Sequence, residues 1–581
     1  MLLFPRGKIR KKKYLAFDEV LPDLPGDVSF DRERMEGVLE KPFSRWSFFA
    51  LIFVLASIAL VILGRVFLLS IINEDRFLLR AEDNRLRKEL IQPSRGIIYD
   101  RKGNSIAENV WDEEEGKLLR FLRHPTAYSH VVGFLGKPSR ADFAGLPELE
   151  GFSFIGKDGI EYFYDGVLRG EMGYEVGEVD AAGTIVSRGV IQEPKDGRSI
   201  FLSIDSALQE TSFEILSKTA ENHGFKGGAI LVFDVTNGEM LALASYPSFD
   251  ANMLSRGISE ENLTELVKSA ENPFFNRAIA GLYPPGSSIK PYLALAGLED
   301  HVIEPEKEIL STGSISLPNP YDENQKTLFL DWKAHGWVDM RRALAVSSNV
   351  YFYTLGGGYG DVRGLGIRRI KQWLEQFGFS GLTGIDLAGE AGGVLPDPDW
   401  KETAHPEDPL WRIGDTYNVS IGQGDVLVTP VEAAYALMTL VSNGIPKTPH
   451  LVLGFNNEDN TFIEAASRDV THTKLSLAPS SFAVVREGMR DAVLYGTASA
   501  LFQLQTPIAG KTGTAESGNR RFTHSWFIGF APLENPQMGI VVFLESGPKE
   551  NLVGGVATTL ELFRWIENNG GIETILAKSS F

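Results

Sequence analysis

An uncharged run near the start of the chain limits what the protein can fold into. Residues Phe48–Gly64 read FFALIFVLASIALVILG, and after Arg65 the apolar run resumes through 66–72. About 20 apolar residues cross a bilayer as one helix, and an arginine near one end can reach the interface. A buried core helix and a cleaved signal peptide are the alternatives, but no small-residue cleavage site follows. The sequence therefore predicts one transmembrane helix over 47–72.

The predicted anchor separates residues 1–46 from the rest of the chain. Basic side chains occur on both sides of the apolar run, so the positive-inside rule does not orient it. Residues 1–46 mix charges with prolines and show no sustained periodicity, and we expect a flexible tail. Its basic cluster at 6–13 is suited to contact with anionic lipid and equally to simple solvation.

Composition narrows the class of protein further. The 581 residues suffice for roughly two to four domains, and a hydrophobic fraction of 43% can bury a large core. The net charge of −19 argues against nucleic-acid binding, which normally needs a basic patch. Because the chain has no cysteine, disulfide scaffolds, cysteine nucleophiles and cysteine-based metal sites are excluded.

Residues 73–200, which follow the anchor, are expected to form a small β-rich domain. Its first part, 73–90, has the pattern of a helix that continues outward from the membrane. Residues 94–109 then predict a strand, a turn and a second strand. We expect Arg95 and Asp100 to organise this part through an ion pair.

Residues 201–570 indicate an α+β domain, and 571–581 a short C-terminal tail. Residues 228–244 predict a β-hairpin, and further strands are predicted near the other end of the domain, at 506–513, 525–530 and 538–544. The middle, 287–450, is mostly helical with glycine breaks. Strands at both ends with helices between them imply one sheet that joins the two ends of the domain.

The most informative motif is YPPGSSIK at residues 283–290. A helix that begins near Ser287, after the stiff turn of two prolines and a glycine, would direct free N–H groups at the Ser287 oxygen. Lys290 is expected on the same helical face, within hydrogen-bond reach of Ser287. It can act as a base only if burial or a nearby cation keeps it neutral. The motif alone is weak, because SGPK at 546–549 repeats it in an expected turn.

Two further motifs make this pattern specific. Ser347-Ser348-Asn349 follows Ser287 by 60 residues, and Lys511-Thr512-Gly513-Thr514 begins 164 residues later. The order S-x-x-K, S-x-N, K-T-G is the active-site set of the penicillin-recognising serine enzymes. With these motifs the chain resembles a class B penicillin-binding protein, a D,D-transpeptidase of peptidoglycan synthesis. The resemblance covers about residues 84–567.

This resemblance implies a fold and a set of site residues. The fold is a five-stranded antiparallel sheet flanked by helices, with a helical subdomain, on a β-rich pedestal. The implied catalytic residues are Ser287 as nucleophile, Lys290 as its base, Ser347 as proton relay, Asn349 and Lys511. The implied substrate-binding residues are Thr512, Gly513 and Thr514, and the backbone N–H groups of Ser287 and Thr514 would form the oxyanion hole. No metal or other cofactor is implied.

Details within the motifs resemble the penicillin-binding protein 2 type, which serves cell elongation and shape. These are YPPGSSIKP, GDT at 414–416 and IGQG at 421–424. The implied partners are stem peptides, lipid-linked glycan strands, a SEDS glycosyltransferase and a rod-shape complex. Because that substrate lies outside the cytoplasm, we expect an inner-membrane protein with a cytoplasmic N-terminus and a periplasmic catalytic domain. The head insertion of such proteins is almost absent between Asn109 and His124.

Two other functions stay open. A D,D-carboxypeptidase would use the same motifs with water as the acceptor, and a non-catalytic β-lactam-binding scaffold or receptor would only bind. The intact motifs argue against a scaffold, and residues 1–46 are too short for a signalling domain. Asp331 and His335 do not make an obvious metal-ligand set. Three tryptophans are expected in the core: Trp332, Trp337 and Trp411.

Overall fold

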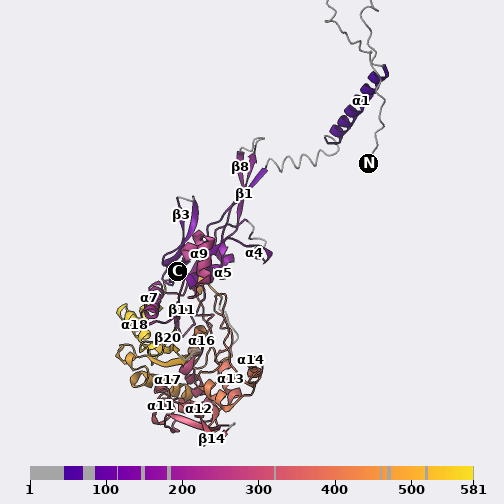
Figure 1. Cartoon of the computed structure of the whole chain (residues 1–581). Coiled ribbons are helices and arrows are strands. Elements are labelled where there is room, and N and C mark those ends of the chain that lie inside the picture. The colour runs from indigo at the N-terminus through magenta and orange to yellow at the C-terminus, as the bar shows by residue number, and fades with distance from the viewer. Residues whose placement is uncertain are drawn as a thin grey trace, which may run out of the picture. The chain divides into compact units, whose positions relative to one another are not determined.

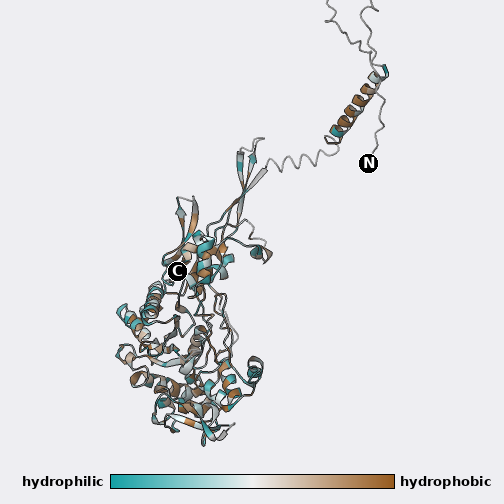
Figure 2. Cartoon of the chain, viewed as in Figure 1, coloured by the Kyte–Doolittle hydropathy of each residue, from teal (hydrophilic) through white to brown (hydrophobic). Residues whose placement is uncertain are grey.

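The computed structural model describes residues 45–69, 86–113, 116–145, 149, 151–179, 185–319, 322–457, 459, 461–466, 473–516 and 521–579. The predicted apolar helix is present as α1 (Arg45–Phe67). It is 23 residues long with a mean hydropathy of 2.7, and none of its residues is buried in the protein (Figure 2). Its length and composition suit a single membrane span. The predicted tail falls almost wholly outside the described residues.

The helix expected over 73–90 is wrong where the structure describes it. Residues Leu86–Ile91 form strand β1, which pairs in a three-stranded sheet with β7 (Gly173–Val179) and β8 (Ile185–Gln192). Residues 73–85 lie outside the described ranges. Three charged residues separate the two leucines of this segment, and pairing with the distant strand β7 decides its conformation.

A six-stranded sheet contains the strands predicted over 94–109. Its order is β17-β16-β9-β2-β3-β4. The strands are β2 (Ile98–Tyr99), β3 (Ser105–Asp112), β4 (Lys117–Leu122), β9 (Ile200–Leu202), β16 (Val452–Asn456) and β17 (Phe462–Glu464). The β3–β4 hairpin occupies the stretch between Asn109 and His124. Strands from both ends of the chain thus build this sheet, which joins the pedestal to the residues that follow it.

The ion pair of Arg95 differs from the expected one. Arg95 binds Glu161 at 2.6 Å and Asp165 at 2.8 Å, and not Asp100. Glu161 lies on α5 (Gly159–Phe163), is fully buried, and also binds Arg120 at 2.7 Å. The Asp100 carboxylate instead accepts backbone N–H groups of the turn that follows it. Segments about 65 residues apart in sequence therefore meet at one buried carboxylate.

Replacing Glu161 by alanine should destabilise the protein strongly. It would leave the buried guanidinium groups of Arg95 and Arg120 without their shared carboxylate. Breaking such a buried network costs roughly 3 to 5 kcal/mol of unfolding free energy. The control is Glu171→Ala, which removes an exposed pair with Lys195 and should cost about 0 to 1 kcal/mol. Denaturant unfolding of both variants measures this, and equal losses would contradict it.

A five-stranded antiparallel sheet forms the centre of the C-terminal domain, as the resemblance implied (Figure 1). Its order is β11-β10-β20-β19-β18. The strands are β10 (Gly227–Asp234), β11 (Met240–Tyr246), β18 (Ala509–Glu516), β19 (Phe522–Ala531) and β20 (Met538–Pro548). The predicted hairpin and all three predicted late strands are confirmed. The SGPK repeat is not a turn, because Ser546–Pro548 continue β20.

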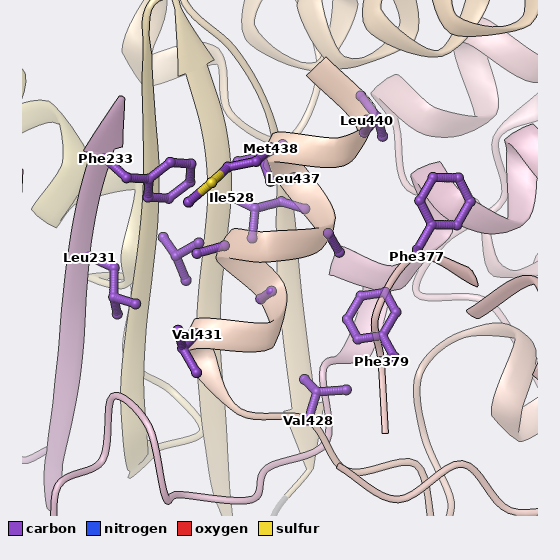
Figure 3. Packing of buried hydrophobic residues seen from close by; sticks show 14 of the residues in the cluster. Leu231, Phe233, Phe377, Phe379, Val428, Val431, Leu437, Met438, Leu440 and Ile528 are labelled. Atoms are coloured by element: carbon purple, nitrogen blue, oxygen red, sulfur yellow. The ribbon is translucent and has the colours of Figure 1, made fainter. Parts of the chain in front are cut away.

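Helices cover both faces of this sheet. Leu231 and Phe233 of β10 pack against α16 (Pro430–Val441), where Met438 points toward Phe233 (Figure 3). The alternate residues, such as Val232, face the opposite side, which is covered by α7 (Ser206–His223) and α18 (Gly555–Asn568). Because side chains alternate along a strand, both faces are apolar and the sheet is fully enclosed.

The middle of the chain is helical as predicted, but it also contains strands. Its longer helices are α10 (Lys290–Glu299), α11 (Met340–Ala345), α12 (Asn349–Gly357), α13 (Ile367–Gln376), α14 (Pro398–Ala404) and α15 (Ile413–Ser420). Four strands were not predicted: β12 (Ile309–Ser311), β13 (Ser314–Asn319), β14 (Asp322–Leu330) and β15 (Gly336–Val338). Helix α17 (Pro479–Leu494) precedes β18.

The C-terminal residues are not a free tail where the structure describes them. They form α19 (Gly571–Leu576), and the buried Arg101 donates to the carbonyl oxygens of Leu576 and Ala577 at 2.6 and 3.2 Å. The end of the chain is thus bound to the turn after β2. The domain boundaries predicted from the sequence stay predictions.

Candidate active site

Ser287 lies in a short 3-10 turn, η4 (Gly286–Ile289), directly before α10. Gly286 holds the turn against β18 with φ of 54°, and a β-carbon there would lie 2.5 Å from the Thr514 carbonyl oxygen. Its N–H donates to Gly422 at 2.9 Å, in the IGQG segment. Only glycine combines this conformation with this close approach. The Ser287 side chain lines a groove of about 750 Å³.

Lys290 is fully buried at the start of α10. Its Nζ lies 2.9 Å from the Ser347 carbonyl oxygen, 2.8 Å from Asn349 Oδ1 and 3.4 Å from Ser347 Oγ. Among the described residues none forms a hydrogen bond with the Ser287 hydroxyl, so the expected contact between Ser287 and Lys290 stays a prediction.

The surroundings of Lys290 favour the neutral amine. Burial lowers its pKa to about 7, although the Asp331 carboxylate raises it. Burial also lowers the pKa of Lys511 well below its ordinary value, and the charge of Lys290 lowers it further. A neutral amine has two N–H bonds, which the oxygens of Ser347 and Asn349 accept, and one lone pair left to take a proton. This is the condition that a lysine base requires.

Ser347 connects the two lysines. Lys511 Nζ donates to Ser347 Oγ at 2.8 Å, and Lys290 Nζ donates to the Ser347 carbonyl oxygen at 2.9 Å. Ser347 has φ of 59°, which is unfavourable for a residue with a β-carbon, so the surrounding structure must hold it. The side chains of all three motifs therefore meet at one point, although the sequence separates them by 60 and 164 residues.

The strand β18 borders the groove with Thr512, Gly513 and Thr514. A β-carbon at Gly513 would lie 2.6 Å from the Pro285 carbonyl oxygen, so glycine lets the strand approach the Ser287 turn. Thr512 Oγ1 already shares a hydrogen bond of 2.7 Å with Thr497. Binding of substrate by these residues, and the oxyanion hole of the Ser287 and Thr514 N–H groups, stay predictions.

The surroundings of two tryptophans and the role of Asp331 differ from what the sequence led us to expect. Trp332 is 56% exposed and lines the groove, and Trp337 is 58% exposed, so neither belongs to the core. Asp331 was considered only as a metal ligand, but it accepts hydrogen bonds from the Ser347 region. In sequence, residues 331–333 directly follow β14, whose last three residues are apolar. His524 is buried against Tyr283 and Phe543.

Comparison with known proteins agrees with this geometry. The family model described as the penicillin binding protein transpeptidase domain matches residues 228–563, and that of the penicillin-binding protein dimerisation domain matches 116–202. The curated peptidoglycan D,D-transpeptidase MrdA of Acinetobacter baumannii is 29% identical, over 84% of this chain and 83% of that protein. Its namesake in Escherichia coli is 31% identical, over 76% and 70%.

Solved structures are similar over an equally long part of the chain. Penicillin-binding protein 2 of Pseudomonas aeruginosa, in complex with WCK 5153, is 31% identical with a TM-score of 0.69, over 85% of this chain and 99% of that one. The protein from Helicobacter pylori in complex with MreC is 26% identical with a TM-score of 0.69, over 84% and 99%.

The fold and the matched models define the class: this is a penicillin-binding protein with a transpeptidase domain. The relatives place it more narrowly. The chain belongs to the penicillin-binding protein 2 subfamily, as the resemblance of its motifs indicated.

Proposed function

We propose that this chain is a peptidoglycan D,D-transpeptidase of cell-wall elongation that works through a Ser287 acyl-enzyme. The observation that carries the proposal is the buried Lys290, with a pKa near 7, in contact with Ser347 beside the Ser287 groove. A buried neutral lysine next to a serine in a groove is the arrangement expected for serine activation. The curated relatives reported above are named as peptidoglycan D,D-transpeptidases.

In the acylation step, Ser287 Oγ attacks the carbonyl carbon of the penultimate D-alanine. Lys290 accepts the hydroxyl proton, directly or through Ser347, and a C–O bond forms. The C–N bond then breaks, and the terminal D-alanine leaves with a proton delivered through Ser347, which Lys511 contacts. The Ser287 and Thr514 N–H groups would bind the oxygen that becomes negative. A β-lactam would acylate the same serine.

In the second step an acceptor breaks the ester. The amine of a neighbouring stem peptide attacks the carbonyl carbon, loses a proton to the site and forms the cross-link, while Ser287 regains its hydrogen. Water in place of the amine would make the enzyme a D,D-carboxypeptidase. The curated relatives are named as D,D-transpeptidases, which favours transpeptidation.

The membrane anchor and the relatives suggest where and with what the enzyme works. The substrate lies outside the cytoplasm, so we infer a cytoplasmic N-terminus and a periplasmic catalytic domain at the inner membrane, with α1 as the single span. A structure of the Helicobacter pylori relative contains MreC, and another similar structure is of a peptidoglycan synthase complex. These structures support a rod-shape complex as the partner, and we infer that a SEDS glycosyltransferase belongs to it.

The full-length protein in detergent tests the activity with a pentapeptide that ends in D-Ala-D-Ala. We expect D-alanine release and, when an amine such as glycine is added, a product carrying that amine, both detected by mass spectrometry. Release with only the hydrolysed tetrapeptide would support the carboxypeptidase. Neither product, together with no penicillin adduct, would support the scaffold.

A further inference from the structure

One buried carboxylate outside the three motifs accepts hydrogen bonds from the Ser348 hydroxyl and the Val350 N–H. Asp331 lies between β14 and β15, and its side chain is fully buried. Its Oδ2 accepts hydrogen bonds from Ser348 Oγ at 2.8 Å, from the Val350 N–H at 3.0 Å and from Ser311 Oγ at 3.1 Å. Its Oδ1 accepts the Trp332 N–H at 2.9 Å. Asp331 thus ties the S-x-N motif to β12 and to its own segment.

The neighbouring Trp332 binds the other end of the loop formed by residues 346–350, called the Ser347 loop below. Its indole N–H donates to the Val346 carbonyl oxygen at 3.2 Å. Ser347, with φ of 59°, therefore lies between an anchor at 346 and anchors at 348 and 350. A backbone in this unfavourable region persists only when its surroundings hold it. Asp331 and Trp332 supply such restraints.

The restrained loop is the part that both lysines contact. The Ser347 carbonyl oxygen accepts from Lys290 at 2.9 Å, and its hydroxyl accepts from Lys511 at 2.8 Å. If the loop relaxed toward a common conformation, both contacts would be lost together. A shift of about 1 Å in a catalytic group can cost on the order of 100-fold in rate.

We propose that Asp331 is a positioning residue for acylation, because its carboxylate holds the Ser347 loop in the geometry that serves Lys290 and Lys511. The inference rests on the proposed serine acyl transfer and adds to it a residue outside the three motifs. Asp331 does not contact the groove nucleophile and acts through Ser348 and Val350.

The charge of Asp331 also distinguishes this role from a purely structural one. Its carboxylate raises the pKa of Lys290, against the stronger effect of burial. The other groups that face the pair are Lys511, the Phe352 ring at 5.3 Å from Lys290 Nζ, and His335, whose Nε2 lies 3.6 Å from Asp331 Oδ1. Burial lowers the pKa of His335, so it stays neutral near pH 7. Removing the Asp331 charge should therefore lower the pKa of Lys290.

Two substitutions separate geometry from charge in the full-length protein. Asp331→Ala removes all the hydrogen bonds and should slow acylation by a fluorescent penicillin about 100-fold at its pH optimum. Asp331→Asn keeps one acceptor oxygen and loses the charge. In the wild type the rate should rise with pH through about 7, as Lys290 loses its proton. In Asp331→Asn this rise should occur at lower pH.

Asp386→Ala is the matched control. Asp386 is equally buried and accepts the N–H groups of Leu451 and Val452 at 2.7 and 2.9 Å, away from the lysines. The Asp386→Ala variant should have a lower melting temperature. Its acylation rate when folded, and the pH profile of that rate, should be unchanged. An unchanged rate in Asp331→Ala, or an unshifted profile in Asp331→Asn, would overturn the proposal. If the wild type itself is not acylated at any pH, the proposed function fails instead.

Discussion

Ser287→Ala should form no covalent adduct with penicillin, whereas the wild type gains the mass of one penicillin per chain. The hydroxyl is the only atom of that side chain that can attack, and no neighbour can replace it. Ser288 is buried and its hydroxyl donates to the Pro285 carbonyl oxygen at 2.8 Å. Loss of a catalytic serine lowers the rate by roughly four to six orders of magnitude. Intact-mass spectrometry after incubation measures this.

The second S-x-x-K sequence supplies the control. Ser546→Ala removes the serine of SGPK, which continues β20 and does not lie before a helix. This variant should be labelled like the wild type. An adduct that persists in Ser287→Ala, or one that disappears in Ser546→Ala, would show that the nucleophile is a different serine.

Lys290→Met should slow acylation about 100- to 10,000-fold, the usual contribution of a general base. Methionine fills a similar buried volume without the amine, so the fold should survive. The wild-type rate should fall as pH drops below about 7, because protonated Lys290 cannot accept the serine proton. The variant should lack this dependence, and raising the pH should not restore its rate. Stopped-flow labelling across a pH series measures both effects.

Lys401→Met is the comparison for losing a lysine that is almost fully buried. Lys401 lies on α14, outside the three motifs, and its Nζ is 2.8 Å from Asp415 Oδ2. It should lower stability but not the acylation rate of the folded protein. If both variants lose rate equally, or if Lys290→Met keeps the wild-type pH profile, then Lys290 is not the base.

The motifs predicted which residues would meet, but not how they contact each other. Spacing along a helix led us to expect Lys290 near Ser287, and the structure adds its hydrogen bonds to Ser347 and Asn349, which come from a distant segment. The same limit applies to Arg95, which binds Glu161 and not the nearer Asp100. The spacing of residues along a short segment does not show which side chain from a distant segment will contact them. The roles of the individual site residues stay predictions until the variants are measured.

Exposure was also hard to judge from residue type. Trp332 and Trp337 are apolar enough for a core, yet both are more than half exposed. Trp332 reaches the groove because its segment joins two strands that the sequence did not predict, β14 and β15. An indole can border a groove while its N–H binds the backbone, as it does at Val346.

Local periodicity and residue identity were enough to predict the apolar helix, the apolar central strands and the three motifs. The arrangement of distant segments placed β9 and β16 in one sheet with β2, β3 and β4 and brought the Asp331 carboxylate to the Ser348 hydroxyl. It also decided that both lysines are buried, which is what lowers the pKa of each. Burial is the sum of contacts from many distant segments, so no local pattern contains it.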